Sequence, residues 1–375
     1  MSEDTLPEPD RVEGAPHPRE TEVLYGQTAA EAEFLTAFNA GKTHHAWLLH
    51  GTQGIGKATL AWRIARFLLN QPREAGDCPF AKPELPQTLE ADPTHPAVRR
   101  ARTLGEPRLA LVRRGWNEKT KHLQNVITIY EVRKLKSFFA LSIPDGGWRV
   151  AIVDAADEMN TSAANAMLKI LEEPPEKTVL LLIAHQPARL LPTIRSRCRG
   201  LRCAPLSSAD VAAALVQAGH PAGEDAAAIA ELSAGSAGSA LRLIRDDGVA
   251  IYAQLLGLLT SAPGIDRGAV LNLADGCTGT ANAGHYGLIL SLITLLLTRL
   301  ARYAAAQPAI WTEAVPDEAR AFARLGPSPG HGRQWAELTA GLSARIGHAK
   351  EVNIDPAGVV LDALLAIDAH AKQVV

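Results

Sequence analysis

Residues 51–59 of the chain, Gly-Thr-Gln-Gly-Ile-Gly-Lys-Ala-Thr, match a phosphate-binding loop at all positions but one. In the pattern Gly-x-x-x-x-Gly-Lys-Ser/Thr, backbone N–H groups and a helix N-terminus bind the phosphates, and the lysine adds a positive charge. The hydroxyl that normally binds Mg²⁺ is missing at Ala58, and Thr59 lies one residue too far along to replace it. The sequence therefore predicts a phosphate site without normal metal coordination, and its candidate residues are Gly51, Gly54, Gly56, Lys57 and Thr59.

A second motif for nucleotide hydrolysis is also incomplete. Asp154 follows an apolar run and occupies the position of a metal-binding carboxylate, but the next residue, where a general base belongs, is Ala155. Losing a positioned base typically costs roughly 10²–10⁴ in rate. Glu158 is nearby, but we expect it to point elsewhere, because Asp157 and Glu158 are best interpreted as the start of a loop before the cap at Asn160. Asp154 is therefore also a candidate residue of the nucleotide site. The two replacements, Ala58 at the metal position and Ala155 at the base position, would both impair ATP hydrolysis.

A third candidate is the basic stretch 186–199, which includes Arg195, Arg197 and Arg199. Taken alone, it is best interpreted as a solvated basic face. An arginine inserted into a neighbouring subunit's active site is the alternative, because such a residue stabilises transition-state charge.

Short apolar runs alternate with helical patterns around these motifs. Strands are expected at 45–50, 148–153 and 178–184, and the first leads into the glycine loop, followed by a helix over 58–70. Asn160 is the expected N-cap of another helix, which Pro174 ends. Uncharged strands alternating with helices predict a mostly parallel sheet buried on both faces.

The chain divides by pattern into four parts. Residues 1–20 are acidic and proline-rich and are expected to be disordered. Residues 21–205 form the α/β domain, with 78–116 interpreted as an insertion or long loop. Residues 206–248 form a small helical domain, in which Ser207 or Ser208 caps a helix to 216, a second helix spans 224–233 and a third opens after 235. Residues 249–375 are helical throughout.

Composition excludes some classes of function. The chain has 375 residues, 47% of them hydrophobic, and a net charge of −2, so it is not a polyanion binder by composition. The four cysteines form no zinc pattern and no disulfide framework, which fits a reducing cytoplasm. The N-terminus resembles no secretory signal. The apolar run 287–298 is shorter than the roughly 20 residues that span a bilayer, so we expect a buried helix or a subunit interface rather than a membrane anchor.

The motifs together resemble the clamp-loader branch of the AAA+ ATPases, in the type found in alphaproteobacteria. The resemblance covers about 24–70 and 125–245, and four stretches carry it: His44–Gly51, Asn165–Pro175, Leu191–Cys198 with its Ser-Arg-Cys signature, and Leu232–Leu241. It implies an AAA+ P-loop domain followed by a helical lid and a helical collar that holds a pentameric ring together.

The resemblance also implies a role. It is to the stationary ring member, which does not hydrolyse ATP and belongs to the complex that loads the sliding clamp onto primed DNA for the replicative polymerase. The implied partners are gamma/tau-type motor subunits, a delta subunit, the sliding clamp and primer-template DNA. The arginine that enters the neighbour's ATP site corresponds to Arg197, with Ser196 and Cys198 fixing the turn.

The chain departs from the family pattern at two places. A four-cysteine zinc module follows the first helix in many relatives, but only Cys78 stands there, so no zinc or other metal is expected. The arginine that senses nucleotide in active motors is replaced by Gly238. Binding of ATP or ADP is left open. Two alternatives remain beside the stationary role: an ATP-hydrolysing gamma/tau-type motor, and a free-standing nucleic-acid-binding AAA+ protein.

Overall fold

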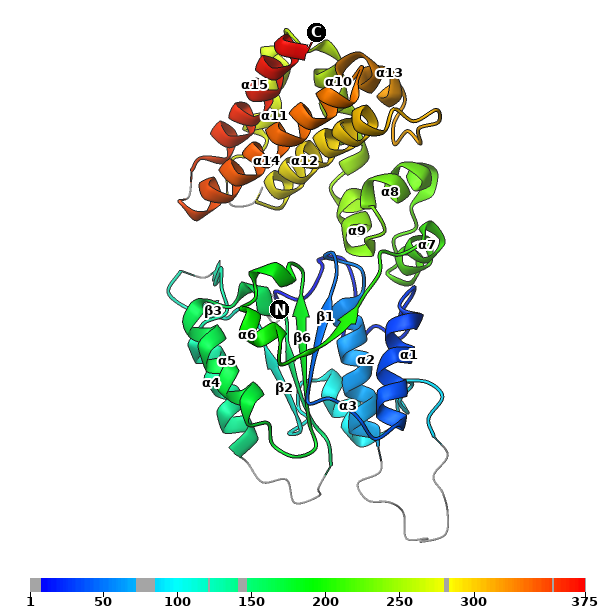
Figure 1. Ribbon diagram of the computed structural model, residues 1–375, viewed down its shortest axis with the longest axis vertical. Coiled ribbons are helices and arrows are strands. Elements are labelled where there is room, and N and C mark those ends of the chain that lie inside the picture. The colour runs from blue at the N-terminus through cyan, green and yellow to red at the C-terminus, as the bar shows by residue number, and fades with distance from the viewer. Residues whose placement is uncertain are drawn as a thin grey trace, which may run out of the picture. The chain divides into compact units, whose positions relative to one another are not determined.

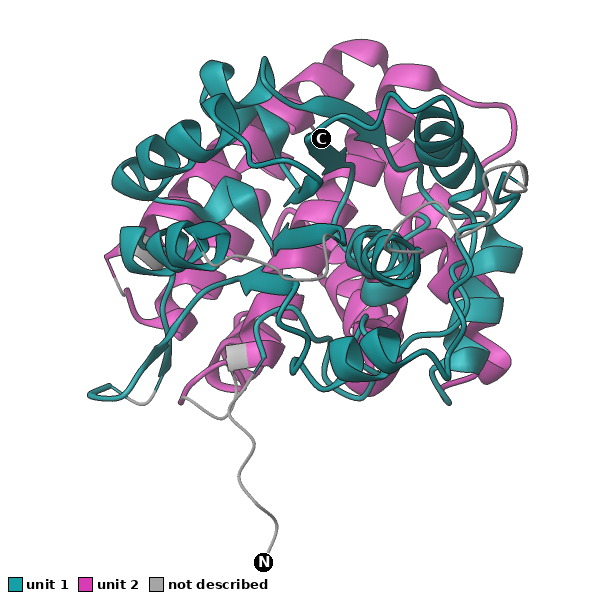
Figure 2. Ribbon diagram, turned by 90° about the horizontal axis from the view of Figure 1, so that it is seen from below, with its two compact units in different colours: residues 1–219, 235–238 teal, residues 220–234, 239–375 magenta. Residues whose placement is uncertain are grey.

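The computed structural model describes residues 8–71, 85–120, 122–140, 147–279, 283–352 and 354–374. The chain forms two compact units, which are coloured separately in Figure 2. Unit 1 contains residues 1–219 and 235–238, and unit 2 contains residues 220–234 and 239–375. The candidate site residues all belong to unit 1. Figure 1 shows that helices lie on both sides of the sheet in this unit.

Unit 1 is built on a five-stranded sheet in the order β2-β5-β6-β1-β7, and all of its strand pairs are parallel. Its strands are β1 (Ala46–His50), β2 (Leu109–Val112), β5 (Arg149–Val153), β6 (Thr178–Ala184) and β7 (Arg199–Arg202). The central strand β6 is buried along its whole length. A small antiparallel pair, β3 (Trp116–Asn117) with β4 (His122–Leu123), lies apart from this sheet.

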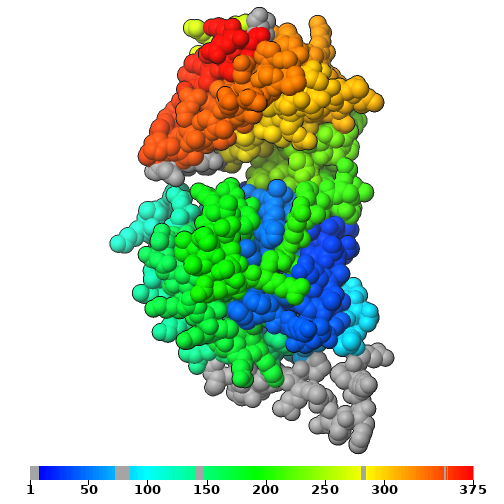
Figure 3. Space-filling view, in the orientation of Figure 1, coloured from blue at the N-terminus to red at the C-terminus, as the bar shows by residue number. Residues whose placement is uncertain are grey.

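Helices cover both faces of the sheet because successive strand side chains point to opposite sides. On one face Trp47, Leu49 and Leu181 pack with α1 (Thr28–Asn39), α2 (Lys57–Asn70) and α3 (Pro96–Arg102). On the other face Leu48 and Leu180 pack with α4 (Ile129–Ala140), α5 (Thr161–Glu172) and α6 (Pro192–Arg195). In the space-filling view the blue and the green segments of unit 1, far apart in sequence, share one surface (Figure 3).

The expected strands and helix caps are confirmed. The three predicted strands are β1, β5 and β6, and the helix after the glycine loop is α2. The Asn160 side chain accepts a hydrogen bond from the N–H of Ala163 at 2.9 Å, as an N-cap does. Ser207 in the same way accepts from Asp210 at 3.1 Å and begins α7 (Ser208–Gln217).

Two edge elements differ from the expectation. Strand β7, which was not expected, begins at Arg199, the last residue of the basic stretch, and forms one edge of the sheet. The segment interpreted as an insertion contributes α3 and β2, the strand at the other edge. Part of that segment, including Cys78, lies outside the described residues. Edge strands are short here, so each carries little periodic signal.

The N-terminal segment also differs from the expectation of disorder over 1–20. Residues 1–7 lie outside the described residues, but from Glu8 onward the chain packs against α2 and the sheet. His17 is buried against Trp62, and the carbonyl oxygens of Arg19 and Thr21 accept hydrogen bonds from Arg66 of α2. Low hydrophobicity favoured disorder, and specific polar contacts override it.

The remaining helices are α8 (Ala226–Ser233), α9 (Ala237–Arg245), α10 (Gly248–Ser261), α11 (Arg267–Asp275), α12 (Ala283–Ala306), α13 (Glu318–Leu325), α14 (Pro329–Glu351) and α15 (Pro356–Val374). Three short 3-10 helices occur at 156–158, 187–189 and 223–225. The helical character expected of the C-terminal third is confirmed, whereas its division from a separate lid domain stays a prediction.

Helix α12 contains the long apolar run. The helix is longer than the run, and its segment Gly284–Ala306 is long and apolar enough to cross a membrane by length and composition alone. However, 61% of that apolar window is buried inside the protein. Arg299 of α12 also donates hydrogen bonds to the fully buried Glu318 of α13 at 2.8 Å. These contacts make α12 the core helix of unit 2, the interpretation that the sequence favoured.

Candidate nucleotide site and the arginine turn

The glycine loop joins β1 to α2 and has the backbone that a phosphate loop requires. Its three pattern glycines have positive φ angles of 150° at Gly51, 78° at Gly54 and 97° at Gly56. Side chains rarely adopt such angles, so glycine is needed at each position. Gly56 is the N-cap of α2, which leaves the N–H groups of the first helical turn free to face an anion.

Lys57 is turned back onto its own loop. Its Nζ donates hydrogen bonds to the carbonyl oxygens of Gly51 at 2.8 Å and Thr52 at 2.5 Å, and the residue is only 3% exposed. Burial lowers the Lys57 pKa to about 8, although Cys203 and Asp154 act in the opposite direction. The positive charge that would meet a phosphate is therefore engaged inside the loop.

Asp154 stands at the carboxyl end of β5, and its N–H donates to the carbonyl oxygen of Val112 at the end of β2. Burial, followed by the charge of Asp10, raises the Asp154 pKa to about 7. The next residue, Ala155, has a left-handed φ of 59°. A magnesium ion needs octahedral oxygen ligands, and Ala58 supplies none where a hydroxyl is normally the ligand. The residues present therefore do not fit a normal Mg²⁺ site, and Ala155 supplies no carboxylate to act as the base.

Asp157 and His185 belong to the site but were not predicted as site residues. The Asp157 carboxylate accepts hydrogen bonds from the N–H groups of His185 at 3.1 Å and Gln186 at 2.7 Å, which ties the end of β5 to the end of β6. Burial and the charge of Lys57 lower the His185 pKa to about 4, so its ring is neutral. The sequence could have indicated His185, because it directly follows the predicted strand 178–184 and ligands bind at the carboxyl ends of parallel strands.

Glu158 and Thr59 do not complete the site. Glu158 forms an ion pair with Arg114 at 3.0 Å, so it points elsewhere, as expected. Thr59 is half-buried within the first turn of α2, where it follows Ala58 along the helix. Neither residue is placed as a substitute for the missing hydroxyl or the missing base.

The outer side of the loop is held by residues from two distant segments. The N–H of Gly238 donates a hydrogen bond to the carbonyl oxygen of Gly54 at 3.0 Å. The Ser236 hydroxyl donates to the carbonyl oxygen of Gln53 at 2.8 Å. The amide of Gln27 donates to the carbonyl oxygens of Ile55 at 2.9 Å and Ala204 at 2.8 Å. These hydrogen bonds tie the loop backbone to both segments.

Arg197 lies away from this group, in the turn between α6 and β7. Its guanidinium donates to the carbonyl oxygen of Thr193 at 3.0 Å and pairs with Glu172 of α5 at 2.8 Å, and its side chain is 37% exposed. The Ser196 hydroxyl also donates to Thr193. Cys198 packs on the core, and burial raises its pKa to about 12. Ser196 and Cys198 thus hold the turn, and Arg197 faces outward.

Known proteins resemble part of this chain. Residues 26–207 match the family model described as DNA polymerase III, delta subunit. The DNA polymerase III subunit delta' of Pseudomonas aeruginosa is 40% identical over 212 residues, covering 56% of this chain and 58% of that protein. The subunit delta' of Escherichia coli is 34% identical over 217 residues, covering 57% and 59%. A crystal structure of a DNA polymerase III gamma subunit-related protein from Thermotoga maritima covers 90% of this chain and 99% of its own, with 15% identity and a TM-score of 0.37.

The fold and the site define a P-loop protein of the AAA+ class that lacks a hydroxyl at Ala58 and a carboxylate at Ala155. Residues 26–207, just under half of the chain, are similar to the DNA polymerase III delta subunit family, and the two curated relatives named above are of the delta' type. The aligned region spans less than two thirds of the length of these relatives.

Proposed function

We propose that this chain is a delta'-type stationary subunit of a bacterial clamp loader. In this role it assembles with gamma/tau-type motor subunits and a delta subunit in a pentameric ring in the cytoplasm. The complex places the sliding clamp on primer-template DNA as part of the DNA polymerase III holoenzyme. The chain contributes Arg197 to the ATP site of a neighbouring motor subunit and hydrolyses no ATP itself.

The observation that carries this proposal is the contrast between Arg197 and Lys57. Lys57 is buried and engaged by its own loop, whereas Arg197 is presented outward on a fixed turn. Its partner Glu172 is 49% exposed, and exposed ion pairs are typically worth about 0–1 kcal/mol. An incoming phosphate can therefore displace Glu172 at little cost, and a guanidinium there is worth roughly 10³–10⁵ in rate.

The chain's own nucleotide site supports binding at most. Its glycines retain the phosphate-loop backbone, which allows ATP or ADP to bind without being hydrolysed, and no zinc or other metal is part of the proposal. Two alternatives, a gamma/tau-type motor and a free-standing nucleic-acid-binding protein, need features that Ala58, Ala155 and the net charge of −2 do not supply.

Purified components test the proposed role. The chain alone is expected to release phosphate from ATP no faster than its Lys57→Ala variant. Mixed with gamma/tau-type and delta subunits, it is expected to co-elute in one complex whose ATPase is stimulated by primed DNA and the clamp. Turnover by the isolated chain above the Lys57→Ala background would instead support the motor. Tight, salt-dependent DNA binding by the isolated chain, without assembly, would support the third function.

A further inference from the structure

The N-terminal segment, residues 8–25, lies against several parts of the glycine-loop site. Leu24 packs at Gly56, because a Cβ added to that glycine would stand 2.9 Å from Leu24 Cδ1. Val12 approaches Gly238, with 3.7 Å between its Cγ2 and the corresponding Cβ position. Gly238 is the residue that bonds to Gly54 of the loop. The segment therefore reaches both the helix end and the outer side of the loop.

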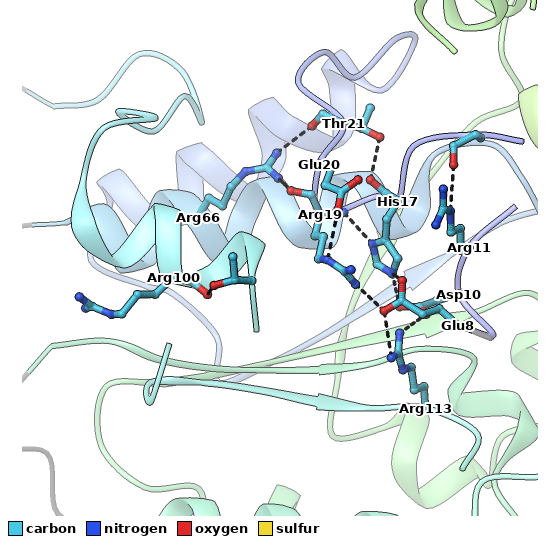
Figure 4. Close-up of polar contacts among 12 residues, drawn as sticks. Glu8, Asp10, Arg11, His17, Arg19, Glu20, Thr21, Arg66, Arg100 and Arg113 are labelled. Atoms are coloured by element: carbon cyan, nitrogen blue, oxygen red, sulfur yellow. Dashed lines mark hydrogen bonds and ion pairs between the residues drawn. The ribbon is translucent and has the colours of Figure 1, made fainter. Parts of the chain in front are cut away.

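Asp10 is the centre of the contacts that hold this segment (Figure 4). One carboxylate oxygen accepts a hydrogen bond from Arg113 at 2.5 Å, and the other lies 3.1 Å from His17 Nε2. The N–H of Arg19 donates to His17 Nδ1 at 3.0 Å, so the ring proton is on Nε2 and faces Asp10. The Asp10 side chain and His17 are each only 1% exposed.

Glu8 strengthens the same cluster. Its carboxylate pairs with Arg19 at 2.6 Å and with Arg113 at 3.1 Å, so Arg113 is shared by two acids of the segment. Burial opposes the charged forms of Glu8 and Asp10, but their hydrogen-bonded partners outweigh it and lower both pKa values. Removing one partner would leave the other charge buried without compensation, so these contacts hold the segment in place, and we call them the latch.

The latch fastens the segment at the carboxyl ends of β2 and β5, beside Asp154. Arg113 follows directly after β2, and the neighbouring Val112 accepts the hydrogen bond from Asp154. Asp10 is also the charged group with the largest effect on Asp154. A carboxylate at this position both occupies space and repels the negative charge of a triphosphate.

We propose that residues 8–25 are an intramolecular plug that keeps nucleotides off the glycine loop, with Asp10, His17 and Arg113 as its latch. The loop takes the phosphates of a nucleoside triphosphate or diphosphate only after the latch opens. This inference goes beyond the proposed function, because it concerns only the chain's own loop and holds in whatever complex the chain works.

Nucleotide binding to the isolated chain tests the plug, with a fluorescent ATP analogue as the probe and unlabelled ADP as the competitor. The double variant Asp10→Asn with Arg113→Gln removes the charges of the latch. It is expected to bind the probe at least tenfold more tightly than the wild type, because affinity scales with the population of the open state. Arg99→Gln changes an exposed arginine of α3 and serves as the matched control, with wild-type affinity expected. Adding Lys57→Ala to the double variant is expected to abolish the gain.

Two further measurements keep the test decisive. Hydrogen exchange of residues 8–25 is expected to be slow in the wild type and fast in the double variant. A chain lacking residues 1–17, if it folds, is expected to bind as the double variant does. Wild-type binding as tight as that of the double variant would overturn the plug, as would absence of probe binding by an opened chain with rapid exchange over 8–25. Neither result depends on assembly with other subunits, so the clamp-loader role is judged separately.

Discussion

The backbone N–H of Gly238 donates a hydrogen bond to the carbonyl oxygen of Gly54, and a Cβ on Gly238 would stand only 3.0 Å from the Gly54 Cα. The resemblance described above predicts that Gly238 stands where active motors carry a nucleotide-sensing arginine. The contact gives a physical reason for the glycine, because any side chain would press on the backbone of the phosphate loop. The missing sensor and the fixed loop are thus one structural feature.

Gly238→Ala is therefore expected to destabilise the protein by about 1–2 kcal/mol, since overpacking against backbone outweighs the gain in helix propensity. The matched control is Gly257→Ala in α10, where an added Cβ meets nothing within 4 Å. That change is expected to stabilise by about 0.5–1 kcal/mol. Denaturant unfolding of the two variants measures the difference, and equal effects from both would show that the Gly54 contact constrains nothing.

Asp154→Asn tests the buried carboxyl group through its pH dependence. Burial raises the Asp154 pKa from 3.8 to about 7, so between those values the folded state holds a proton that the unfolded state has lost. This contribution to stability is fully present below pH 3.8 and is lost as the pH rises through 7. Asparagine does not titrate.

The stability of Asp154→Asn relative to the wild type should therefore increase between pH 5 and pH 8, by an amount on the order of 1–4 kcal/mol. Urea unfolding across that range gives the comparison, and Asp275→Asn at an exposed position of α11 is the control. A difference that stays constant with pH would mean that Asp154 titrates normally in the folded protein.

Ala58→Thr restores the hydroxyl of the phosphate loop and is expected to create no ATP hydrolysis. The position of the general base still holds Ala155, and its φ of 59° is unfavourable for a larger side chain. Steady-state phosphate release by the purified variant is the measurement, with Lys57→Ala added to the same variant as the background. Turnover above that background would show that another residue, such as Glu158, acts as the base.

The sequence predicts the centre of unit 1 better than its edges. The three central strands carry mostly apolar runs, and the side chains of Asn160 and Ser207 accept hydrogen bonds from the first turns of the helices that they cap. Local sequence is therefore enough to predict these elements. Strands β2 and β7 each have only four residues and depend on pairing with β5 and β1, which no local pattern encodes.

The candidate site follows the same rule. The glycine loop, Asp154 and Arg197 lie in contiguous motifs and can be predicted from them. Asp10 and Gln27 act only because the fold brings them to residues far away in the chain, Arg113 and Ala204. A polar, proline-rich segment is typical of disorder, and its order here rests on those long-range contacts.

The role of Arg197 is measured most directly in the reconstituted complex, by comparing the DNA-stimulated ATPase of Arg197→Ala with that of Arg195→Ala, an exposed arginine one residue before the same turn. Both variants are expected to fold and to assemble. Arg197→Ala should slow hydrolysis at the neighbouring site by about 10³-fold or more, so the total ATPase falls by the share that this site carries, whereas Arg195→Ala should match the wild type. An assembled Arg197→Ala complex with wild-type ATPase would contradict the account.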